Sequence, residues 1–538
     1  MGAHTPAVRR FVQFALTLVG LFGQLALPAA SPKSPPRYDW LQFGGNAAHS
    51  NNNQREQVIT RRSLPRMHVL FRVALPAMSD GAAVYLHHVH TQRGVLDLVF
   101  LSTIEGDTIA LDGHTGATIW SHRYRNVPCS STDSLACEAH TTPAIDPNRR
   151  YVYAYALDGR VHKFAVGTGT ETTSGGWPET ATMKPTQEKS AGALTVAVSS
   201  GNTYLYVENG GYTSDSGDYQ GHLTTINLRT GGQHVFNMLC SEHVDIHFQQ
   251  GTEQDCPATQ AAVWARAGVV YDASFGRLFA VTGNGPFCPP DPTLRGSDCP
   301  AGTLDWGDSV VALNPDGTGN GAVPLDSFTP KNQQFLNTAD ADLGSVSPVI
   351  LPGTRKYRHL GLQAGKQFPS HPGDSVCPCR VPLYLLDLAN LSKQNGPGHL
   401  GGALGHPLDL PQAYDVRVGH PAVWTDHASG RTYVFIANEK GISAIRLRVD
   451  RAGNPSLASA WTVRASCSST LMVNQVLFCA GGFDHTPPSG TLWARDPLTG
   501  AALWHAHIGG THWQAPMVAN GVLYLPDFSG YLNAFTVG

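Results

Sequence analysis

The sequence has few charged residues and no excess of either sign. Charged residues are 14% of the 538 residues, and the formal net charge is −3. A nucleic-acid-binding domain needs a basic face, so we expect no nucleic-acid partner. Long helical periodicities are also lacking. The 57 Gly and 37 Pro are spread along the whole chain, which is typical of many short strands joined by turns.

Only one stretch is apolar enough to be considered for a membrane. It runs from Phe11 to Leu27, follows Arg9 and Arg10, and ends in small residues near Ala30. A basic start, an apolar run and a small-residue exit are the parts of a secretory signal, and about 17 residues is the lower limit for a membrane span. We therefore predict a signal peptide at residues 1–30, a secreted or periplasmic mature protein, and no membrane span after cleavage. A membrane anchor is the alternative.

The cysteine usage agrees with an oxidising compartment. Ten cysteines are present, and no C-x-x-C-H motif for a covalently attached c-type haem occurs. Eight of them lie in short-range pairs that predict loop disulfides: Cys129/Cys137, Cys240/Cys256, Cys288/Cys299 and Cys467/Cys479. Adjacent pairing of Cys377 and Cys379 would be strained. A metal site is conceivable there, and a loop disulfide is preferred.

Two segments repeat the same pattern. Residues 110–120 and 494–504 both follow A-x-D-x-x-T-G-x-x-x-W. The Asp and Thr side chains can bond turn amides, and the Gly supplies the positive φ that a tight turn needs. The closing tryptophans, Trp120 and Trp504, can pack between neighbouring sheets. The pattern therefore predicts a strand, a tight turn and a second strand.

Weaker copies of this unit fill the chain between the two segments. Each follows an apolar strand that tends to open with a small residue and a proline, as at Pro143, Pro348, Pro421 and Pro516. Counting gives eight units of roughly sixty residues, within the range of propeller repeats. The last unit stops after three strands, and residues 67–75 can supply its fourth. We predict an all-β, eight-bladed β-propeller of four-stranded antiparallel blades over residues 31–538, closed by an N-terminal strand.

This repeat resembles the quinoprotein alcohol dehydrogenase superfamily, whose propellers bind pyrroloquinoline quinone. The opening segment, residues 39–46, is also similar to that superfamily's. The order of Thr329-Pro330 and then Asp340-x-Asp342 resembles the polyvinyl-alcohol dehydrogenase branch most. The resemblance covers essentially the whole mature chain and implies a quinone site in the middle blades.

The resemblance assigns roles to five residues. Thr282-Gly-Asn-Gly-Pro-Phe287 is similar to the family's T-G-N-x-x-P-W stretch, whose Asn binds Ca²⁺, and this makes Asn284 a metal ligand. Trp264 would stack under the quinone. Asp340 would be the catalytic base and a metal ligand, and Asp342 a further metal ligand. Lys366 would contact the quinone carbonyl oxygens, a catalytic as well as a cofactor-binding role. Taken singly, each residue also has an ordinary explanation as a turn or strand-end residue.

One family feature is missing. No Glu stands where the family has its calcium ligand, and Asp215 or Asp218 could replace it. The implied function is oxidation of an alcohol, small or polymeric, or of a sugar. Hydride would pass to a Ca²⁺-bound quinone, and an external acceptor would take the electrons. The alternative is a non-catalytic propeller scaffold that binds a protein or polymer.

Overall fold

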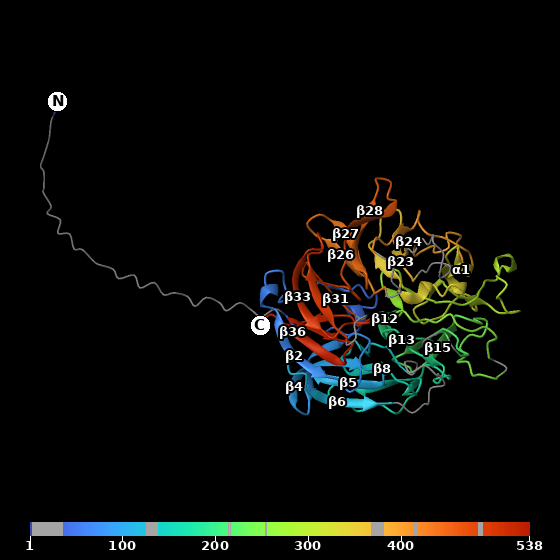
Figure 1. The fold of residues 1–538 in the computed structure, drawn as a ribbon, viewed down its shortest axis with the longest axis horizontal. Helices are drawn as coiled ribbons and strands as arrows, with labels where there is room; N and C mark the ends of the chain where they lie inside the picture. Colours follow the sequence, from blue (N-terminus) through green and yellow to red (C-terminus); the bar gives the residue numbers. More distant parts are fainter. Residues whose placement is uncertain are drawn as a thin grey trace. The chain divides into compact units, whose positions relative to one another are not determined.

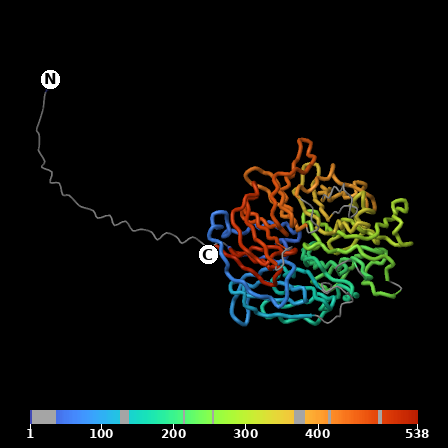
Figure 2. The backbone as a smooth tube through the Cα atoms, viewed as in Figure 1, coloured from blue at the N-terminus to red at the C-terminus, as the bar shows by residue number. Residues whose placement is uncertain are grey.

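The computed structural model describes residues 36–124, 138–212, 215, 217–252, 255–366, 381–412, 418–482 and 488–538, together with Met1 and Gly2. The unit Arg37–Gly538 consists of β-sheets that follow one another around a ring, as the colour sequence of the backbone shows (Figure 1, Figure 2). The predicted signal peptide lies almost wholly outside the described residues and stays a prediction. Cys129, Cys137, Cys377 and Cys379 also lie outside them.

Eight four-stranded antiparallel blades make up the propeller, which confirms the predicted fold class. In sheet order, the first four blades are β3 (Val84–Thr91), β4 (Gly94–Ser102), β5 (Asp107–Asp112), β6 (Thr118–Arg123); β7 (Ala144–Ile145), β8 (Tyr151–Tyr155), β9 (Arg160–Ala165), β10 (Glu179–Thr180); β12 (Thr195–Ser199), β13 (Asn202–Gly211), β14 (His222–Asn227), β15 (Gln233–Asn237); and β16 (Val270–Asp272), β17 (Arg277–Val281), β20 (Val310–Leu313), β21 (Asp326–Phe328). The other four are β22 (Val349–Leu351), β23 (Leu360–Gln363), β24 (Pro382–Asp387), β25 (Leu408–Asp409); β26 (Ala422–Asp426), β27 (Arg431–Asn438), β28 (Gly441–Val449), β29 (Pro455–Val463); β30 (Leu471–Val473), β31 (Val476–Gly481), β32 (Gly490–Arg495), β33 (Ala502–Ile508); and β34 (Met517–Ala519), β35 (Val522–Pro526), β36 (Tyr531–Thr536), β2 (His68–Ala74).

A few short elements lie outside the blades. They are β1 (Asn52–Asn53), β11 (Glu188–Lys189), the pair β18 (Phe287–Cys288) and β19 (Asp305–Trp306), the helix α1 (Gln333–Thr338), and the 3-10 turns η1 (Phe43–Gly45), η2 (Leu64–Arg66), η4 (Pro292–Leu294) and η5 (Leu343–Ser345). Several first strands of neighbouring blades contact one another, as β7 and β12 do. These first strands therefore form the inner ring.

The ring closes through the N-terminal strand, as predicted. Strand β2 pairs antiparallel with β36, from His68 opposite Thr536 to Ala74 opposite Tyr531, and Figure 1 shows the blue β2 beside the red β36. This pairing completes the last blade. It also satisfies backbone groups that would otherwise remain on an open sheet edge.

The blade turns have the predicted chemistry. Asp112 Oδ1 accepts hydrogen bonds from the amides of His114 and Thr115 at 2.7 and 3.0 Å, and Gly116 has a φ of 74°. In the last complete copy, Asp496 Oδ1 accepts from Leu498 and Thr499 in the same way. The Asp side chain thus fixes the turn in two blades that lie nearly four hundred residues apart.

The two repeat tryptophans differ in burial. Trp120 is buried, and its indole N–H donates to the carbonyl of Val166 in the next blade at 2.9 Å. A Cβ on Gly169 would lie 2.7 Å from the Trp120 ring, so the ring packs directly on the neighbouring blade's turn. Trp504 is only partly buried and contacts Phe535 edge-on. Both tryptophans therefore join adjacent blades, but Trp120 makes the stronger contact.

The segment after Pro36 links several blades. It makes hydrogen bonds to inner strands or the residues beside them: Trp40 to Tyr85, Leu41 to Ile145, Gln42 to Val196, His49 to Val269, Ser50 to Val423 and Asn51 to Met472. The segment thus holds first strands from most of the ring together.

Three predicted disulfides form: Cys240–Cys256, Cys288–Cys299 and Cys467–Cys479. Within the described ranges, no helix is long and apolar enough to cross a membrane.

Candidate functional site

Asn284 lies just after β17, in the loop that leads to the β18–β19 pair. Its side chain is buried, and its Nδ2 donates to Asp340 Oδ1 at 2.8 Å. Its backbone N–H donates to Asp342 Oδ1, also at 2.8 Å. The amide oxygen Oδ1 has no hydrogen-bond partner among the described residues. A buried acceptor without a partner is costly, so this oxygen is available to a ligand.

Gly283 permits the close approach of Asp342. A Cβ at this position would lie 2.2 Å from Asp342 Oδ1, and any larger residue would push the carboxylate away from the loop. The Thr-Gly-Asn sequence therefore has two functions here. The glycine makes room for a carboxylate, and the asparagine presents an oxygen beside it.

Asp340 and Asp342 lie in the turn between α1 and η5. Asp342 is almost fully buried, whereas the Asp340 side chain is 62% exposed. Asp340 has a φ of 49°, a left-handed conformation that is uncommon for a residue other than Gly and is often found at functional sites. The turn thus presents one buried and one accessible carboxylate, two residues apart.

Lys366 joins the two carboxylates from the end of β23. Its Nζ lies 2.6 Å from Asp340 Oδ1 and 2.6 Å from Asp342 Oδ2. Burial alone would lower the pKa of Lys366, but the charges of Asp342 and Asp340 outweigh it and raise the pKa above its ordinary value. The Lys366 side chain is therefore a permanent cation held between two anions.

Trp264 lies beside this cluster. The Lys366 ammonium is 5.9 Å from the centre of its ring, and Trp513 meets the same ring edge-on at 6.1 Å. The structure thus brings Trp264, Asn284, Asp340, Asp342 and Lys366 together at one place. Among the candidate residues, this is the convergence that a cofactor site requires.

Two further carboxyl groups belong to the cluster. Asp308 is buried and accepts from the Leu343 amide at 3.0 Å, while its Oδ2 has no partner among the described residues. Burial, together with the charge of Asp342, raises the pKa of Asp308 well above its ordinary value. Asp215 accepts from the Tyr219 hydroxyl at 2.6 Å. Burial and Asp342 raise its pKa as well.

The alternatives Asp215 and Asp218 have different surroundings. Asp215 lines the cavity that contains Asp340 and Asp342. Asp218 instead accepts from Lys184 Nζ at 3.0 Å. Of the two, Asp215 is the one that can contribute to the site.

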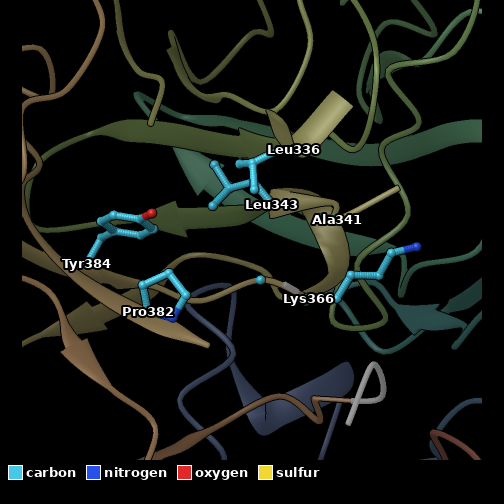
Figure 3. Close-up of a pocket in the computed structure, with 7 residues that line it drawn as sticks. Leu336, Ala341, Leu343, Lys366, Pro382 and Tyr384 are labelled. Atoms are coloured by element: carbon cyan, nitrogen blue, oxygen red, sulfur yellow. The ribbon is translucent and has the colours of Figure 1, made fainter. Parts of the chain in front are cut away.

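One cavity of about 480 Å³ is lined by Trp264, Asp215, Asp340, Asp342 and Lys366, and its volume is within the ~300–1,000 Å³ usual for a small-molecule site. Asn284 and Asp308 are not part of this lining. A smaller, mostly apolar cavity lies behind the Lys366 backbone, and Figure 3 shows the amine pointing away from Tyr384 and Pro382 there. The ammonium group therefore belongs to the larger cavity.

A second wall of the larger cavity, formed around Asp80, was not anticipated from the sequence. Buried Asp80 accepts from His140 Nδ1 at 2.7 Å and from His512 Nδ1 at 2.9 Å, and Arg266 NH2 lies 3.5 Å away. Burial alone would raise the pKa of Asp80, but His512, His140 and Arg266 outweigh it and hold the pKa well below its ordinary value. Lys189 also lines this wall. The wall is therefore rich in cationic and imidazole groups around one buried anion.

A positional signal marks three of these residues. Asp80, His140 and Arg266 each lie four residues before the first strand of a blade, namely β3, β7 and β16. This regular offset is the one sequence signal that these three wall residues share. Elsewhere in the described ranges, the one cluster with metal-ligating groups is Cys240, Cys256 and Asp305, and its two cysteines form a disulfide.

No protein-family model and no curated protein matches this sequence. Solved structures do match. A quinohemoprotein alcohol dehydrogenase from Pseudomonas putida HK5 is 14% identical, with a TM-score of 0.61 over 94% of this chain and 81% of that one. The quinohemoprotein alcohol dehydrogenase from Comamonas testosteroni is 16% identical, with a TM-score of 0.58 over 93% and 80%. A europium-containing methanol dehydrogenase is 13% identical, with a TM-score of 0.58 over 94% and 98%. At these identities, the likeness concerns the fold: the chain has the propeller found in these dehydrogenases.

Proposed function

We propose that this protein is a secreted or periplasmic quinoprotein-type dehydrogenase that oxidises an alcohol or a sugar. One observation carries the proposal. Asn284, Asp340, Asp342 and Lys366 meet beside Trp264 at a cavity of cofactor size, and the buried Asn284 Oδ1 atom has no partner among the described residues. The structures with the same propeller that are named above are alcohol dehydrogenases.

The donor set suits a hard cation. Calcium prefers carboxylate and amide oxygens, and Asn284 Oδ1, Asp340 and Asp342 offer three such ligands, with Asp215 a further candidate across the cavity. A trivalent lanthanide has the same preference for oxygen. We propose that these residues hold Ca²⁺ or a related ion, and that Trp264 supports a flat quinone.

Bound pyrroloquinoline quinone would supply the hydride acceptor. The exposed carboxylate of Asp340 is placed to accept the proton of a substrate hydroxyl, the role of a general base. Lys366 holds that carboxylate in position and provides the positive charge that favours a carbonyl oxygen nearby. The electrons would leave to an external acceptor.

The substrate proposal is broader than one compound. The order of Thr329-Pro330 and Asp340-x-Asp342 resembles the polyvinyl-alcohol dehydrogenase branch, which makes a secondary or polymeric alcohol a substrate to test first. Primary alcohols and sugars complete the panel.

The test is binding and turnover by the purified full-length protein. We expect pyrroloquinoline quinone to bind only when Ca²⁺ or La³⁺ is present, and the loaded protein to reduce an acceptor dye with at least one alcohol of the panel. Asp340→Asn combined with Asp342→Asn removes both effects. Asp316→Asn, in an exposed turn, retains them. Absence of quinone binding with either ion would refute the proposal and favour a non-catalytic scaffold.

A further inference from the structure

Lys189 is a buried lysine for which the described part of the chain supplies no hydrogen-bond acceptor. It ends β11, which pairs with the end of β13, and the residue is 5% exposed. Its side chain lines the cavity described above. Among the described residues, no carboxylate lies within ion-pair distance of its Nζ and no group accepts a hydrogen bond from it. Its one close partner is the Tyr212 ring, 5.6 Å from Nζ.

The charged groups around Lys189 act on its protonated form in both directions. Arg266 shares this wall and donates to the carbonyl of Ala191, two residues from Lys189, at 3.0 Å. Glu138 and Asp80 act in the opposite direction. His140 and His512, which both bond to Asp80, and Tyr212 are further titratable groups nearby. Burial first, and then the charge of Arg266, lower the pKa of Lys189 to about 7.

Lys184, five residues earlier, shows what an ordinary buried lysine looks like in this chain. It is as buried as Lys189, at 5% exposure. Its Nζ lies 3.0 Å from both Asp218 and Asp255, and it donates to Gln220 Oε1 at 2.7 Å. The fold therefore neutralises one buried ammonium group with two carboxylates. It leaves the other open to the cavity beside a second cation.

We propose that Lys189 is a nucleophilic amine that forms an imine with a carbonyl compound bound in this cavity. Desolvation and a neighbouring cation are the two features by which proteins activate a lysine for this chemistry. The nitrogen lone pair of Lys189 attacks the carbonyl carbon and forms a C–N bond. The carbonyl oxygen then leaves as water with the two hydrogens of the amine, and the C=N bond remains. No electrons are exchanged with a third component.

This site is distinct from the proposed dehydrogenase chemistry and needs neither metal nor quinone. Asp340 and Lys366 belong to the other cluster of lining residues, and Lys366 is a permanent cation that cannot serve as a nucleophile. An aldehyde or ketone is the ligand class. It can arise as the product of an alcohol oxidation or enter from solution.

The test is reductive trapping on the metal-free, quinone-free full-length protein. The probes are propanal, a neutral aldehyde, and glyoxylate, an anionic one, each with cyanoborohydride at pH 6 to 10. Peptide mass spectrometry then measures labelling at each lysine. Lys184 is the internal control for burial, and exposed Lys356 is the control for access. At pH 7, about half of Lys189 is neutral, against roughly one in three thousand for a lysine of ordinary pKa.

We expect Lys189 to be labelled at pH 7 at least tenfold faster than Lys356, with a midpoint near pH 7, and Lys184 to stay unlabelled. Preference for glyoxylate over propanal would show that Arg266 selects an anionic carbonyl compound, and equal labelling would assign a neutral one. Labelling of Lys189 no faster than of Lys184, or a midpoint above pH 10, would overturn the proposal. These outcomes do not depend on dye reduction, so the two proposals fail separately.

Discussion

Replacing Lys366 with methionine is expected to tighten cation binding. In the metal-free protein, the Lys366 ammonium occupies the space between Asp340 and Asp342, 2.6 Å from an oxygen of each. A metal ion that takes these oxygens must displace the ammonium group. Lys366 is therefore a tethered competitor for the metal site, and Met keeps the length of the side chain without its charge.

The magnitude follows from the geometry. At an effective dielectric constant of about 20, one pair of unit charges about 4 Å apart is worth about 4 kcal/mol. The contact with Asp340 counts for little because that side chain is 62% exposed, and the freed ammonium recovers part of its hydration. A net gain of about 2 kcal/mol remains from Asp342, which is about thirtyfold in the dissociation constant.

Isothermal titration with Ca²⁺ and with La³⁺ measures this change. Lys356→Met is the matched control, because it removes the same charge from an exposed side chain that donates to Asn454 Oδ1. Thermal unfolding of both variants checks that the fold is kept. If Lys366→Met bound either ion no more tightly than wild type, the idea of a competing ammonium would be wrong.

Three other substitutions test the packing and the buried charges. Asp80→Asn removes the anion that His140, His512 and Arg266 share and should cost about 3 kcal/mol at pH 7. Because the folded pKa of Asp80 is depressed, this contribution is fully present above the unfolded pKa of about 3.9 and is lost as pH falls from there through the folded pKa. The denaturant unfolding curves of variant and wild type should therefore begin to converge below about pH 4. Glu208 has both carboxyl oxygens buried without partners among the described residues, and burial raises its pKa well above the ordinary value. The wild-type protein therefore loses stability as pH rises above about 4.3, and Glu208→Gln should have a higher melting temperature than wild type at pH 8 and nearly the same one at pH 4. A difference in melting temperature that stays constant with pH would contradict a neutral Glu208. Trp120→Ala should lower the free energy of unfolding, measured with denaturant, by about 3–5 kcal/mol. This loss should exceed that of Trp504→Ala, because only Trp120 is buried and donates a hydrogen bond to the next blade. Equal losses for the two variants would show that the inter-blade contact of Trp120 does not account for the stability.

The fold could be predicted because its determinants are local and repeated. Asp112 and Gly116 specify a turn within five residues, and the same pattern at Asp496 and Gly500 specifies it again. Closure by β2 followed from a count of strands, since a blade with three strands leaves an open edge. Even a long-range pairing was therefore within reach of the sequence.

The cluster of residues around Asp340 and Asp342 was predicted for a different reason. Asn284, Asp340, Asp342 and Lys366 stand in short motifs whose order resembles a known family, so their convergence required no knowledge of contacts. Asp308 lies in a segment of the same family-like order, but the resemblance gave it no role; its place in the cluster depends on a single hydrogen bond from the Leu343 amide. Its charged neighbours, Asp342, Lys366 and Asp340, lie in other loops that only the folded structure brings beside it.

The second wall could not be assembled from local sequence at all. Asp80 and His512 are 432 residues apart in the chain, and Arg266 comes from a third blade. Each residue has an ordinary sequence context, and only ring closure places them around one buried carboxylate. The regular offset of Asp80, His140 and Arg266 from the inner strands was available as a signal, but nothing in a single sequence connects it with a cavity.

Residues that stabilise the propeller and residues that line its cavity occupy different positions in the blades. The turn motif and the inter-blade tryptophan lie in the third and fourth strands of a blade or between them, as Asp112 and Trp120 do. Most cavity groups lie instead in the loops outside these strands, Asp340 before a first strand and Lys366 after a second one. Substitutions at the cavity positions therefore leave the blade turns and their hydrogen bonds intact. Asp80 is the exception, because it both lies behind the cavity wall and holds groups from three other blades. A loss of function at Lys189 or Asp340 without loss of stability, set against loss of both at Asp80, is the pattern that this arrangement requires.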